Sequence, residues 1–558
     1  MNVAQTIAKH LAALGTTEAF GIPGGVILEL LYALDAQDGI TPHLLYHEQS
    51  AGFAACGYAQ SGGKLGVAYA TRGPGFTNLL TPIADAYCDS IPALFITAHE
   101  EALPLPGMRV LADQEIDTCA LVRTICKECA RIDTVEEFRV RFPALCSAAL
   151  SGRRGPVVMD IAARLLKESF DGVLPCRSVS PALPPSRELA ASVAARVAAA
   201  ERPVLLVGDG VNQALVADRF RALAERVRVP VVSSRFSHDV LCGSDLYFGY
   251  VGSHGCRAAN FMLAKADLIV SLGNRLHFPL SSASFSGVFE HADLIRFDVD
   301  ETEFSRALPQ SENHVADLVE LLGALGDSAE DFGRHDAWWA TCRTLRARLH
   351  EVDVSATAAA IARMLAGLPL DMIVVNDVGN AEFAVSRAAA YSGCPNRTLY
   401  SKSFGALGCA LGKAIGVHYA TKKPVLCVVG DQGLQMNVQE LQHIAQHRLP
   451  IVVFVVDNGA SGMIRDKELA VYGRALHATR ESGYGAPEWS LIAKAYGLRF
   501  AELTCADALD AGHERGPSLV VLHVDEDGPL TPNLPKGNAC QDMAPALDAD
   551  VFDALERM

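Results

Sequence analysis

The chain alternates between two hydrophobic patterns. Short runs rich in Val, Ile and Leu predict buried strands, and the longer stretches between them carry apolar residues at helical spacing. The strand-like runs fall into three blocks. They are residues 18–22, 65–70, 93–98 and 156–161 in the first block, 203–210, 229–234, 266–273 and 292–300 in the second, and 372–377, 424–431, 450–458 and 518–525 in the third.

This alternation predicts the fold class and the domains. Strands that are apolar throughout and alternate with helices are typical of parallel sheets covered on both faces. We therefore expect an α/β protein with three doubly wound parallel-sheet domains, at residues 1–172, 189–335 and 355–535. The Pro-rich stretch at about 173–188 is interpreted as a linker, and residues 536–558 as a C-terminal tail.

Composition and charge exclude several classes of protein. Half of the 558 residues are hydrophobic and a fifth are charged, which excludes a disordered chain. The net charge of −16 argues against a nucleic-acid-binding protein, which needs clustered Lys and Arg. No apolar run approaches the roughly 20 residues that cross a bilayer, and residues 1–15 predict an amphipathic helix rather than a signal peptide. We expect a cytoplasmic protein with neither nucleic acid nor a membrane as partner.

The cysteines predict no disulfide framework. There are 15, an odd number, and they are scattered along the chain. Cys126 and Cys129 have the CxxC spacing of zinc and redox sites, but a zinc site would need two further ligands, and no second CxxC or HxxxH follows nearby. Chance spacing is the favoured interpretation, with metal or redox use as the alternative.

Polar residues follow two neighbouring strands of the third block. Asp431 ends one strand and Asn458 the next, 27 residues later, so a right-handed crossover places the two strand ends side by side. Ligands bind beyond the carboxyl ends of such strands, and carboxylate and amide oxygens suit Mg²⁺. Alone, either residue would be an ordinary turn or cap residue. The pair instead indicates a magnesium–diphosphate site, which backbone N–H groups could approach at Gly430, Gly433, Gly459 and Gly462.

The segment from Gly430 to Asn458, GDQGLQMNVQELQHIAQHRLPIVVFVVDN, resembles the cofactor motif of thiamine diphosphate (ThDP) enzymes. MNVQELQ and the following GMIR are similar to the acetolactate synthase branch of that family. FGIPGG, YHEQSAGFAACGYAQSGGK and ATRGPGFTNLLTPIADAYCDSIP resemble its pyrimidine-binding domain, and GYVGSHGCRAANFMLAKADLIVSLGNRL with FDVD its central domain. The resemblance covers roughly residues 1–535. It implies a pyrimidine-binding, a central and a diphosphate-binding domain in that order.

The resemblance also implies roles for individual residues. Glu48 would contact the aminopyrimidine ring and help to activate it, Leu407 would lie under the thiazolium ring, and Gln114 would lie near the reacting carbon. The Mg²⁺ ligands would be the side chains of Asp431 and Asn458 and the carbonyl of Ala460. The implied cofactor-binding set is Ile22, Glu48, Thr71, Pro74, Asn78, Gly379, Asn380, Leu407, Gly430, Asp431, Gln432, Gly433, Asn458, Ala460, Ser461, Gly462 and Met463.

The activity implied is that of a ThDP- and Mg²⁺-dependent carboligase. It would decarboxylate a 2-oxo acid such as pyruvate and transfer the acyl carbanion to a carbonyl acceptor. The alternatives are a decarboxylase that releases an aldehyde and a paralogue without catalysis. FAD also stays open, because synthases of this branch hold it in the central domain, where GSHGCRAANF and Arg275 resemble part of the site, whereas related decarboxylases lack it. The family's active site lies between subunits, which implies a homodimer or homotetramer.

Several positions depart from the family pattern. Gln432 replaces a glycine and Asp457 an asparagine in the cofactor motif. His99, Asp113 and Lys467 replace residues around the substrate. The second group predicts a different donor or acceptor. The cations Arg72, Arg465 and Lys467 would suit a substrate with an anionic tail, or could equally be solvated surface charges.

Overall fold

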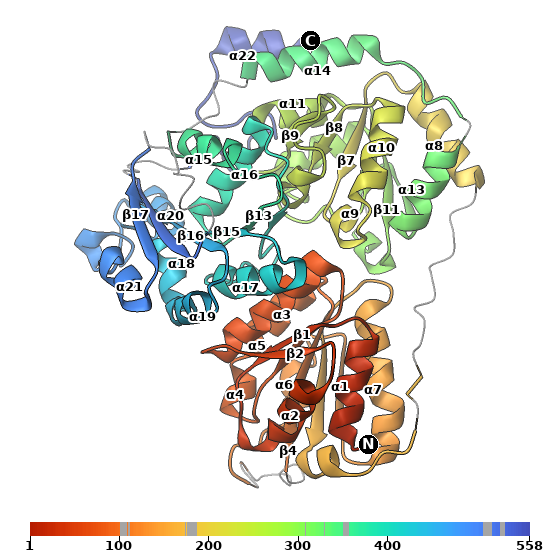
Figure 1. Ribbon diagram of the computed structural model, residues 1–558. Helices are drawn as coiled ribbons and strands as arrows, with labels where there is room; N and C mark the ends of the chain where they lie inside the picture. The colour runs from red at the N-terminus through yellow and green to blue at the C-terminus, as the bar shows by residue number, and fades with distance from the viewer. Residues whose placement is uncertain are drawn as a thin grey trace.

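The computed structural model describes residues 1–100, 109, 112–172, 174–175, 187–306, 308–328, 330–349, 356–505, 516–524 and 530–558. The predicted linker at 173–188 falls almost wholly outside the described residues. Three six-stranded sheets, each parallel throughout, form three α/β domains, so the predicted fold class is confirmed. The first domain lies below the other two, which stand side by side (Figure 1). Among the described helices, none combines the length and apolar character needed to span a bilayer.

The first domain has the strand order β2-β1-β3-β4-β6-β5. Helices α1, α2 and α7 cover one face of the sheet, and α3 and α5 the other, so two separate apolar clusters form. The strands are β1 (Glu18–Gly21), β2 (Thr41–Leu44), β3 (Gly66–Tyr69), β4 (Ala93–His99), β5 (Glu128–Ile132) and β6 (Val157–Ala162). The helices are α1 (Val3–Ala13), α2 (Leu28–Ala36), α3 (Glu48–Gly62), α4 (Pro74–Thr77), α5 (Leu80–Asp89), α6 (Thr118–Val122) and α7 (Val135–Leu150).

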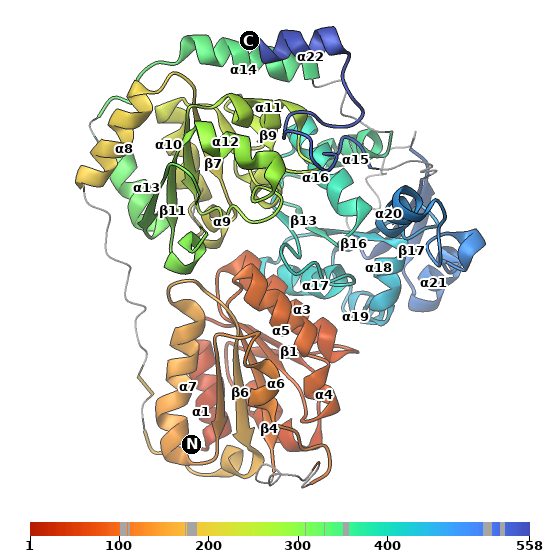
Figure 2. The same cartoon turned by 180° about the vertical axis from the view of Figure 1, so that it is seen from behind.

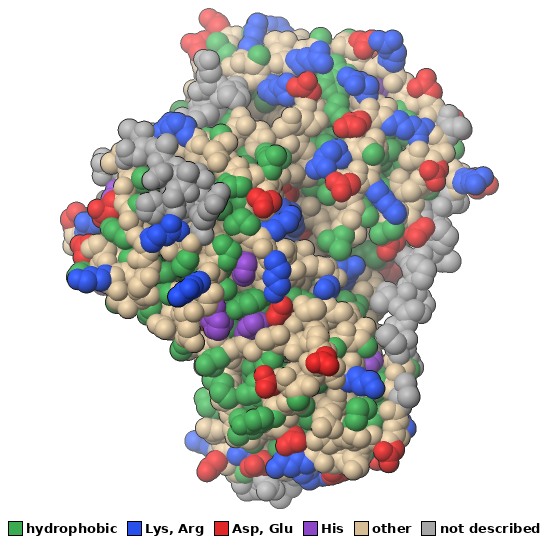
Figure 3. All heavy atoms as spheres, viewed as in Figure 1, with side chains coloured by type: hydrophobic (Ala, Val, Ile, Leu, Met, Phe, Trp, Pro, Cys, Tyr) green, Lys and Arg blue, Asp and Glu red, His purple; other side chains and the backbone are tan. Residues whose placement is uncertain are grey.

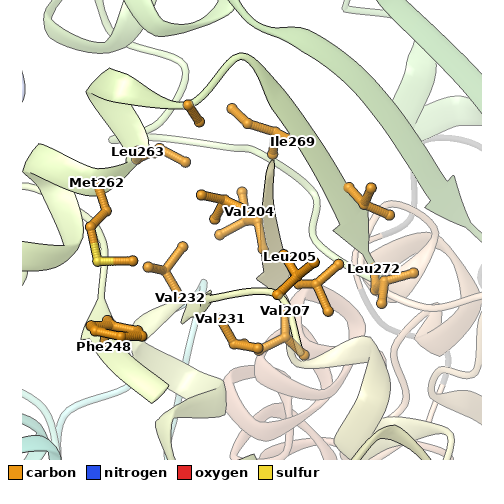
Figure 4. Packing of buried hydrophobic residues seen from close by; sticks show 14 of the residues in the cluster. Val204, Leu205, Val207, Val231, Val232, Phe248, Met262, Leu263, Ile269 and Leu272 are labelled. Atoms are coloured by element: carbon orange, nitrogen blue, oxygen red, sulfur yellow. The ribbon is translucent and has the colours of Figure 1, made fainter. Parts of the chain in front are cut away.

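The central domain has the order β12-β11-β10-β7-β8-β9. Strands β8 and β9 are added on one side of β7 and strands β10 to β12 on the other, so the strand order switches between β7 and β10 while the sheet stays parallel. Its core packs valines and leucines of the central strands against Phe248 and Met262 (Figure 4). The strands are β7 (Pro203–Val207), β8 (Val231–Ser233), β9 (Tyr247–Tyr250), β10 (Leu268–Leu272), β11 (Asp293–Asp298) and β12 (Ser311–Val315). The helices are α8 (Arg187–Ala199), α9 (Gly210–Gln213), α10 (Ala217–Val227), α11 (Arg257–Lys265), α12 (Ser286–His291), α13 (Leu318–Asp327) and α14 (Asp336–Leu349).

The third domain has the order β14-β13-β15-β16-β18-β17, the same order by sequence position as the first domain. Its strands are β13 (Ile373–Asn376), β14 (Thr398–Leu399), β15 (Val425–Gly430), β16 (Ile451–Asp457), β17 (Arg499–Leu503) and β18 (Ser518–His523). Its helices are α15 (Ala356–Ala366), α16 (Asn380–Ser392), α17 (Ala410–Thr421), α18 (Asp431–Met436), α19 (Leu441–Gln446), α20 (Gly462–Tyr472) and α21 (Trp489–Tyr496).

Helices α3 and α17 join the first domain to the third (Figure 1). They run parallel and touch backbone to backbone: a Cβ atom on Gly57 would overlap the Lys413 carbonyl, and one on Gly416 the Ala54 carbonyl. Glycine is therefore required at this contact because any side chain would separate the helices. The N-terminal ends of α3 and α17 lie at the same end of the pair, which places Glu48 on the same side as the Leu407 loop.

The predicted C-terminal tail is in fact folded. Asn533 and Ala544 pair in an isolated antiparallel β-bridge. The final helix α22 (Ala549–Glu556) packs on the central domain beside α14 (Figures 1 and 2). The buried Arg257 donates to the carbonyl oxygens of Met543 and Pro545. The last residues are therefore held against the central domain by these backbone contacts.

The cysteine expectation also needs a correction. A disulfide joins Cys119, in α6, to Cys129, in β5. Cys126, the other half of the CxxC pair, is a buried free thiol whose pKa is raised to about 11 by burial. The bonded pair spans ten residues rather than the CxxC spacing, so the spacing rule did not identify it.

Candidate active site

The third-domain residues of the predicted cofactor set surround one pocket. Its volume is about 210 Å³, and it opens at the carboxyl ends of β13, β15 and β16. All of the third-domain residues predicted to contact the cofactor line it: Gly379, Asn380, Leu407, Gly430, Asp431, Gln432, Gly433, Asn458, Ala460, Ser461, Gly462 and Met463. The two strand-end loops therefore meet as the crossover rule predicts.

Asp431 is a buried carboxylate at the start of α18, with one unsatisfied oxygen. Its Oδ1 accepts the Gln432 N–H at 2.9 Å, whereas its Oδ2 has no hydrogen-bond partner. Burial raises the pKa of Asp431 to about 7; the Tyr484 hydroxyl opposes this shift and the negative charge of Asp457 adds to it. A cation beside Oδ2 would satisfy the free oxygen and favour the charged form, so the carboxylate fits a metal ligand.

The loop after β16 brings amides and backbone close to the pocket. A Cβ atom on Gly462 would lie 2.5 Å from Asn380 Nδ2 and 2.9 Å from Asn458 Nδ2, so only glycine fits there. Both polar atoms of the Asn380 side chain are buried without a partner. Gly462 also begins α20, whose first N–H groups are free to bind an anion. These features fit a diphosphate.

The two departures in the cofactor motif differ in their effect on the pocket. Asp457 does not line the pocket, and its Oδ1 accepts the Gly459 N–H and its Oδ2 the Trp489 indole N–H, both at 3.0 Å, but its carboxylate is close enough to Asp431 to raise the pKa of that residue. Gln432 lines the pocket, but the position that requires a small residue is Gly433. A Cβ atom on Gly433 would lie only 3.2 Å from the Asp377 carboxyl. The glycine of the motif is thus displaced by one position.

The first-domain half of the predicted site gathers around Glu48, the first residue of α3. Asn78 Nδ2 donates to Glu48 Oε2 at 2.9 Å. A Cβ atom on Gly75, next to Pro74, would lie 3.2 Å from Glu48 Oε1 and 2.7 Å from Thr71. Thr71 in turn packs on Gly24, which lies two residues after Ile22 in the loop that follows β1. The structure therefore brings this group of residues together.

Gln114 lies beside the same group through its backbone. It has a left-handed backbone with φ of 60°, and its carbonyl and Cβ pack on Gly73, which adjoins Pro74. Its side chain is exposed, so the structure gives it no partner that tests the expected role near the reacting carbon. Most of the loop before it, residues 101–108 and 110–111, lies outside the described residues.

The two halves do not share a pocket within one chain. Every residue that lines the diphosphate pocket belongs to the range 357–464, and Glu48, Thr71 and Asn78 are not among them.

Asp377 is a buried carboxyl beside the pocket that the hydrophobic pattern did not single out. It is buried at the end of β13, and its Oδ1 accepts the Gly408 N–H at 2.9 Å. Its pKa is raised to about 6 by burial, against the backbone N–H groups of Val378, Gly408 and Ala410. It thereby fixes the loop that carries Leu407. Its place at a strand end, like that of Asp431, was the signal that could have found it.

The three candidate cations for an anionic substrate differ in environment. Arg72 is paired with Glu100 at 2.8 Å and with Glu115 at 3.0 Å, and Arg465 with Asp466 at 2.8 Å. Lys467 is exposed on α20. The charges of both arginines are neutralised locally, which leaves Lys467 as the accessible cation of the three.

His99 is held between two carboxylates at the end of β4. Its Nδ1 bonds Asp160 and its Nε2 bonds Asp133, both at 2.8 Å. Burial lowers the pKa of His99, but the two carboxylates outweigh burial and the net pKa is raised. The side chain therefore serves as an internal ion-pair partner and not as a free acid or base.

A second cavity, of about 190 Å³, lies where the three domains meet, at the point where the central strand order reverses. Dinucleotides bind at such switch points. Arg153, Arg154 and Arg275 line it together with several aspartates, and Arg153 and Arg275 are already paired with Glu303. The Nδ2 atom of Asn274 is buried there without a partner, and this donor and the Arg154 guanidinium fit a phosphate-bearing ligand. The GSHGCRAANF segment does not line it. Arg257 and Asn260 of that segment bind the C-terminal residues instead.

Comparison with known proteins agrees with this geometry. Three family models match the chain: the N-terminal TPP binding domain of thiamine pyrophosphate enzymes over residues 1–121, their central domain over 190–325 and their C-terminal TPP binding domain over 377–522. Similar proteins include the acetolactate synthase isozyme 2 large subunit of Escherichia coli K12, 31% identical over 97% of this chain and 99% of that protein. Another is the acetolactate synthase large subunit of Lactococcus lactis subsp. lactis IL1403, 30% identical over 96% of this chain and 94% of that protein. The chain therefore belongs to the thiamine pyrophosphate (thiamine diphosphate) enzyme family.

Proposed function

We propose that the protein is a ThDP- and Mg²⁺-dependent carboligase that decarboxylates a 2-oxo acid, such as pyruvate, and joins the remaining acyl unit to a carbonyl acceptor. The observation that carries this proposal is the pocket around Asp431, whose unsatisfied carboxylate oxygen and glycine-lined backbone suit a metal-bound diphosphate. The acetolactate synthase large subunits, at about 30% identity, support a ligating reaction.

Each half of the site has a separate task in this proposal. Bound ThDP supplies the carbon nucleophile. Asp431, Asn458 and the Ala460 carbonyl would hold Mg²⁺, Asn380 and the backbone at Gly462 would bind the diphosphate, and Leu407 would support the thiazolium ring. Glu48, kept in place by Asn78, would exchange a proton with the ring nitrogen of the cofactor.

We propose that a second copy of the chain supplies the missing half of each site, in a homodimer or a homotetramer. The separation of the Glu48 group from the Asp431 pocket supports this arrangement. Large apolar side chains are exposed near both halves, among them Tyr46, Tyr87, Met436 and Met463.

Mixing two inactive variants tests the shared site. Glu48→Ala and Asp431→Ala subunits, unfolded and refolded together, should recover about a quarter of the wild-type activity, because half of the dimers are hybrids with one intact site each. Each variant refolded alone is the control. A mixture as inactive as its parts would place both residues of a site on one chain.

Product analysis separates the carboligase from the alternatives. The holoenzyme is incubated with pyruvate, alone and with an aldehyde, a ketone or a second 2-oxo acid, and the products are identified by mass spectrometry. A hydroxyketone or acetohydroxy acid would support the proposal. Acetaldehyde as the sole product would assign the protein to the non-ligating decarboxylases. Cofactor binding without CO₂ release would mark it as a catalytically inactive paralogue.

For the central cavity we propose FAD as the occupant, in a structural role. Its support is the switch-point position and the guanidinium groups of Arg153, Arg154 and Arg275. The carboligase reaction needs no redox step. Flavin absorbance in the purified protein, lost in an Arg275→Ala variant, would support FAD. Purified protein that neither carries nor takes up flavin would refute it.

A further inference from the structure

A buried polar cluster links the Glu48 segment of the first domain to the residues that follow α18 in the third. We call Gln49, Ser50, Asn437 and Glu440 the bridging cluster. Ser50 and Glu440 are 0% exposed and Asn437 is 1% exposed. Ser50 Oγ donates to Asn437 Oδ1 at 2.9 Å, and Asn437 Nδ2 donates to Gln49 Oε1 at 3.1 Å. Polar groups buried so completely are costly unless they are paired, so this contact has one favoured geometry.

Glu440 binds the chain just before Glu48. The Tyr46 N–H donates to both oxygens of the Glu440 carboxylate, at 3.1 and 3.3 Å, and the His47 backbone and the Ser50 hydroxyl also interact with it. These groups lead into the first turn of α3, which Glu48 begins. A carboxylate of the third domain therefore acts as a cap on a helix of the first.

Asn437 extends the cluster to the Leu407 loop. Its Nδ2 also donates to the Gly408 carbonyl at 2.8 Å, while Gly408 packs on Asn437 and Met436. One side chain thus contacts the residue after Glu48 and the residue after Leu407. None of the bridging-cluster residues lines the diphosphate pocket. The cluster can therefore act only by holding the residues next to it in place, namely the start of α3 and the Leu407 loop.

We propose that Asn437 and Glu440 are positioning residues for Glu48. They fix the first turn of α3 against the third domain of the same chain and so aim the Glu48 carboxylate at the pyrimidine ring of the cofactor, which in the proposed dimer is held by the third domain of the second copy. This inference rests on the proposed function of Glu48. It adds that the accuracy of proton exchange depends on two residues that touch neither cofactor nor substrate. A displacement of about 1 Å at a reacting group can lower a rate about 100-fold, which sets the scale of the effect.

The test measures exchange of the C2 proton of bound ThDP for deuterium, by acid quench and NMR, with no 2-oxo acid present. Asn437→Ala and Glu440→Ala should slow the exchange at least about tenfold while the affinity for ThDP with Mg²⁺ stays within about threefold of wild type. Glu440→Gln should keep most of the rate, because its amide oxygen still accepts the Tyr46 N–H. If Glu440→Ala fails to fold, Asn437→Ala alone carries the test.

Gln446→Ala is the matched control. It removes the exposed Gln446–Tyr46 hydroxyl contact across the same two domains and should leave exchange unchanged. Exchange within twofold of wild type in Asn437→Ala, and in Glu440→Ala where it folds, would overturn the inference. So would a loss of exchange that only parallels a loss of cofactor affinity. Because no substrate is used, an enzyme that exchanges normally but forms no ligation product would refute the proposed function and leave this inference standing.

Discussion

The Oδ2 atom of Asp431 is buried and accepts no hydrogen bond from the described residues, and this has an energetic cost. The raised pKa of about 7 means that the folded state disfavours the carboxylate that the unfolded chain carries freely. A cation bound beside this oxygen would offset the cost. Residues that bind a charged ligand commonly carry this cost.

Replacing Asp431 by Asn should separate stability from binding. At pH 8 the variant should raise the free energy of unfolding of the apoprotein by about 1–3 kcal/mol, since no buried charge remains. It should also abolish the stabilisation by ThDP with Mg²⁺, which in the wild type is about 2.7 kcal/mol at 100 times the dissociation constant. Chemical unfolding with and without the ligands measures both effects.

Asp457→Asn is the control for that experiment. Its side chain points to Gly459 and Trp489 and can keep an acceptor for the indole. The ligand-dependent stabilisation should therefore persist in this variant. Equal ligand stabilisation in the Asp431→Asn protein and the wild type would show that the metal site has been misassigned.

At the scale of elements, the contact between α3 and α17 depends on glycine. Gly57→Ala or Gly416→Ala would push a methyl group into a backbone carbonyl of the other helix and should lower the free energy of unfolding by about 1–3 kcal/mol. Gly62→Ala, at the end of α3, is the matched control because its Cβ atom would lie 3.4 Å from that of Ala420. Urea unfolding in which all three variants behaved alike would contradict this account of the helix contact.

Helix α19 carries a histidine that makes stability depend on pH. His443 bonds the Tyr419 hydroxyl and the Leu44 carbonyl and lies near His43 and His447; Figure 3 shows histidines gathered where the first and third domains meet. Burial, followed by the charge of His447, lowers the pKa of His443 to about 3. Between pH 6.5 and about 3 the unfolded chain therefore binds more protons, and stability falls as the pH falls.

The His443→Gln variant should lose less stability than the wild type when the pH is lowered from 7.5 to 5.5. The difference is at most about 1.4 kcal/mol per pH unit. Buried carboxyls with raised pKa values, such as Glu382, shift stability in the opposite direction but are common to both proteins. His291→Gln, at an exposed site on α12, should match the wild type. Parallel pH curves for wild type and His443→Gln would exclude the assigned effect.

The accuracy of the sequence prediction varied with burial. The four central strands of each sheet were predicted because a strand covered on both faces is apolar throughout. The strands that were missed, such as β2, β12 and β17, lie at sheet edges, and their side chains are half exposed, so no apolar run marks them. Edge strands are defined by pairing with a neighbour, which the local pattern does not record.

At the scale of the whole molecule, the site residues also divide into those that the local sequence pattern predicts and those that it does not. Asp431, Asn458 and the glycines beside them were predicted because they follow two strongly apolar strands, whereas the other pocket residues were implied only by the family resemblance. Asn437 and Glu440 were not predicted because their partners lie far away in sequence: Glu440 contacts Tyr46, 394 residues earlier. The separation of Glu48 from the pocket likewise follows from tertiary structure alone.

The C-terminal segment runs from the third domain back to the central one, and its contribution to stability can be tested by truncation. Arg387, only 1% exposed, donates to the carbonyls of Thr531 and Pro532, and Arg257 to those of Met543 and Pro545. Ending the chain at Leu530 would leave both guanidinium groups buried without these acceptors, at a cost of about 3–5 kcal/mol. The thermal midpoint should drop by several degrees.

Ending the chain at Asp548 instead removes α22 and keeps these four carbonyls. That shorter truncation should lower the midpoint less, by the loss of apolar contacts such as Phe552 with Phe261. Equal midpoints for the two truncations would mean that the arginines contribute nothing through these carbonyls.

The identical strand order of the first and third domains points to a common evolutionary origin. Helices α3 and α17 occupy the same place in that order, between the second and third strands, and they meet at matching positions: Gly412 touches Ser50 and Gly416 touches Ala54. A gene duplication would leave this arrangement, with two ancestral copies still paired along their original contact. On that history, the segment that begins at Glu48 and the loop at Leu407 are diverged descendants of one ancestral helix start.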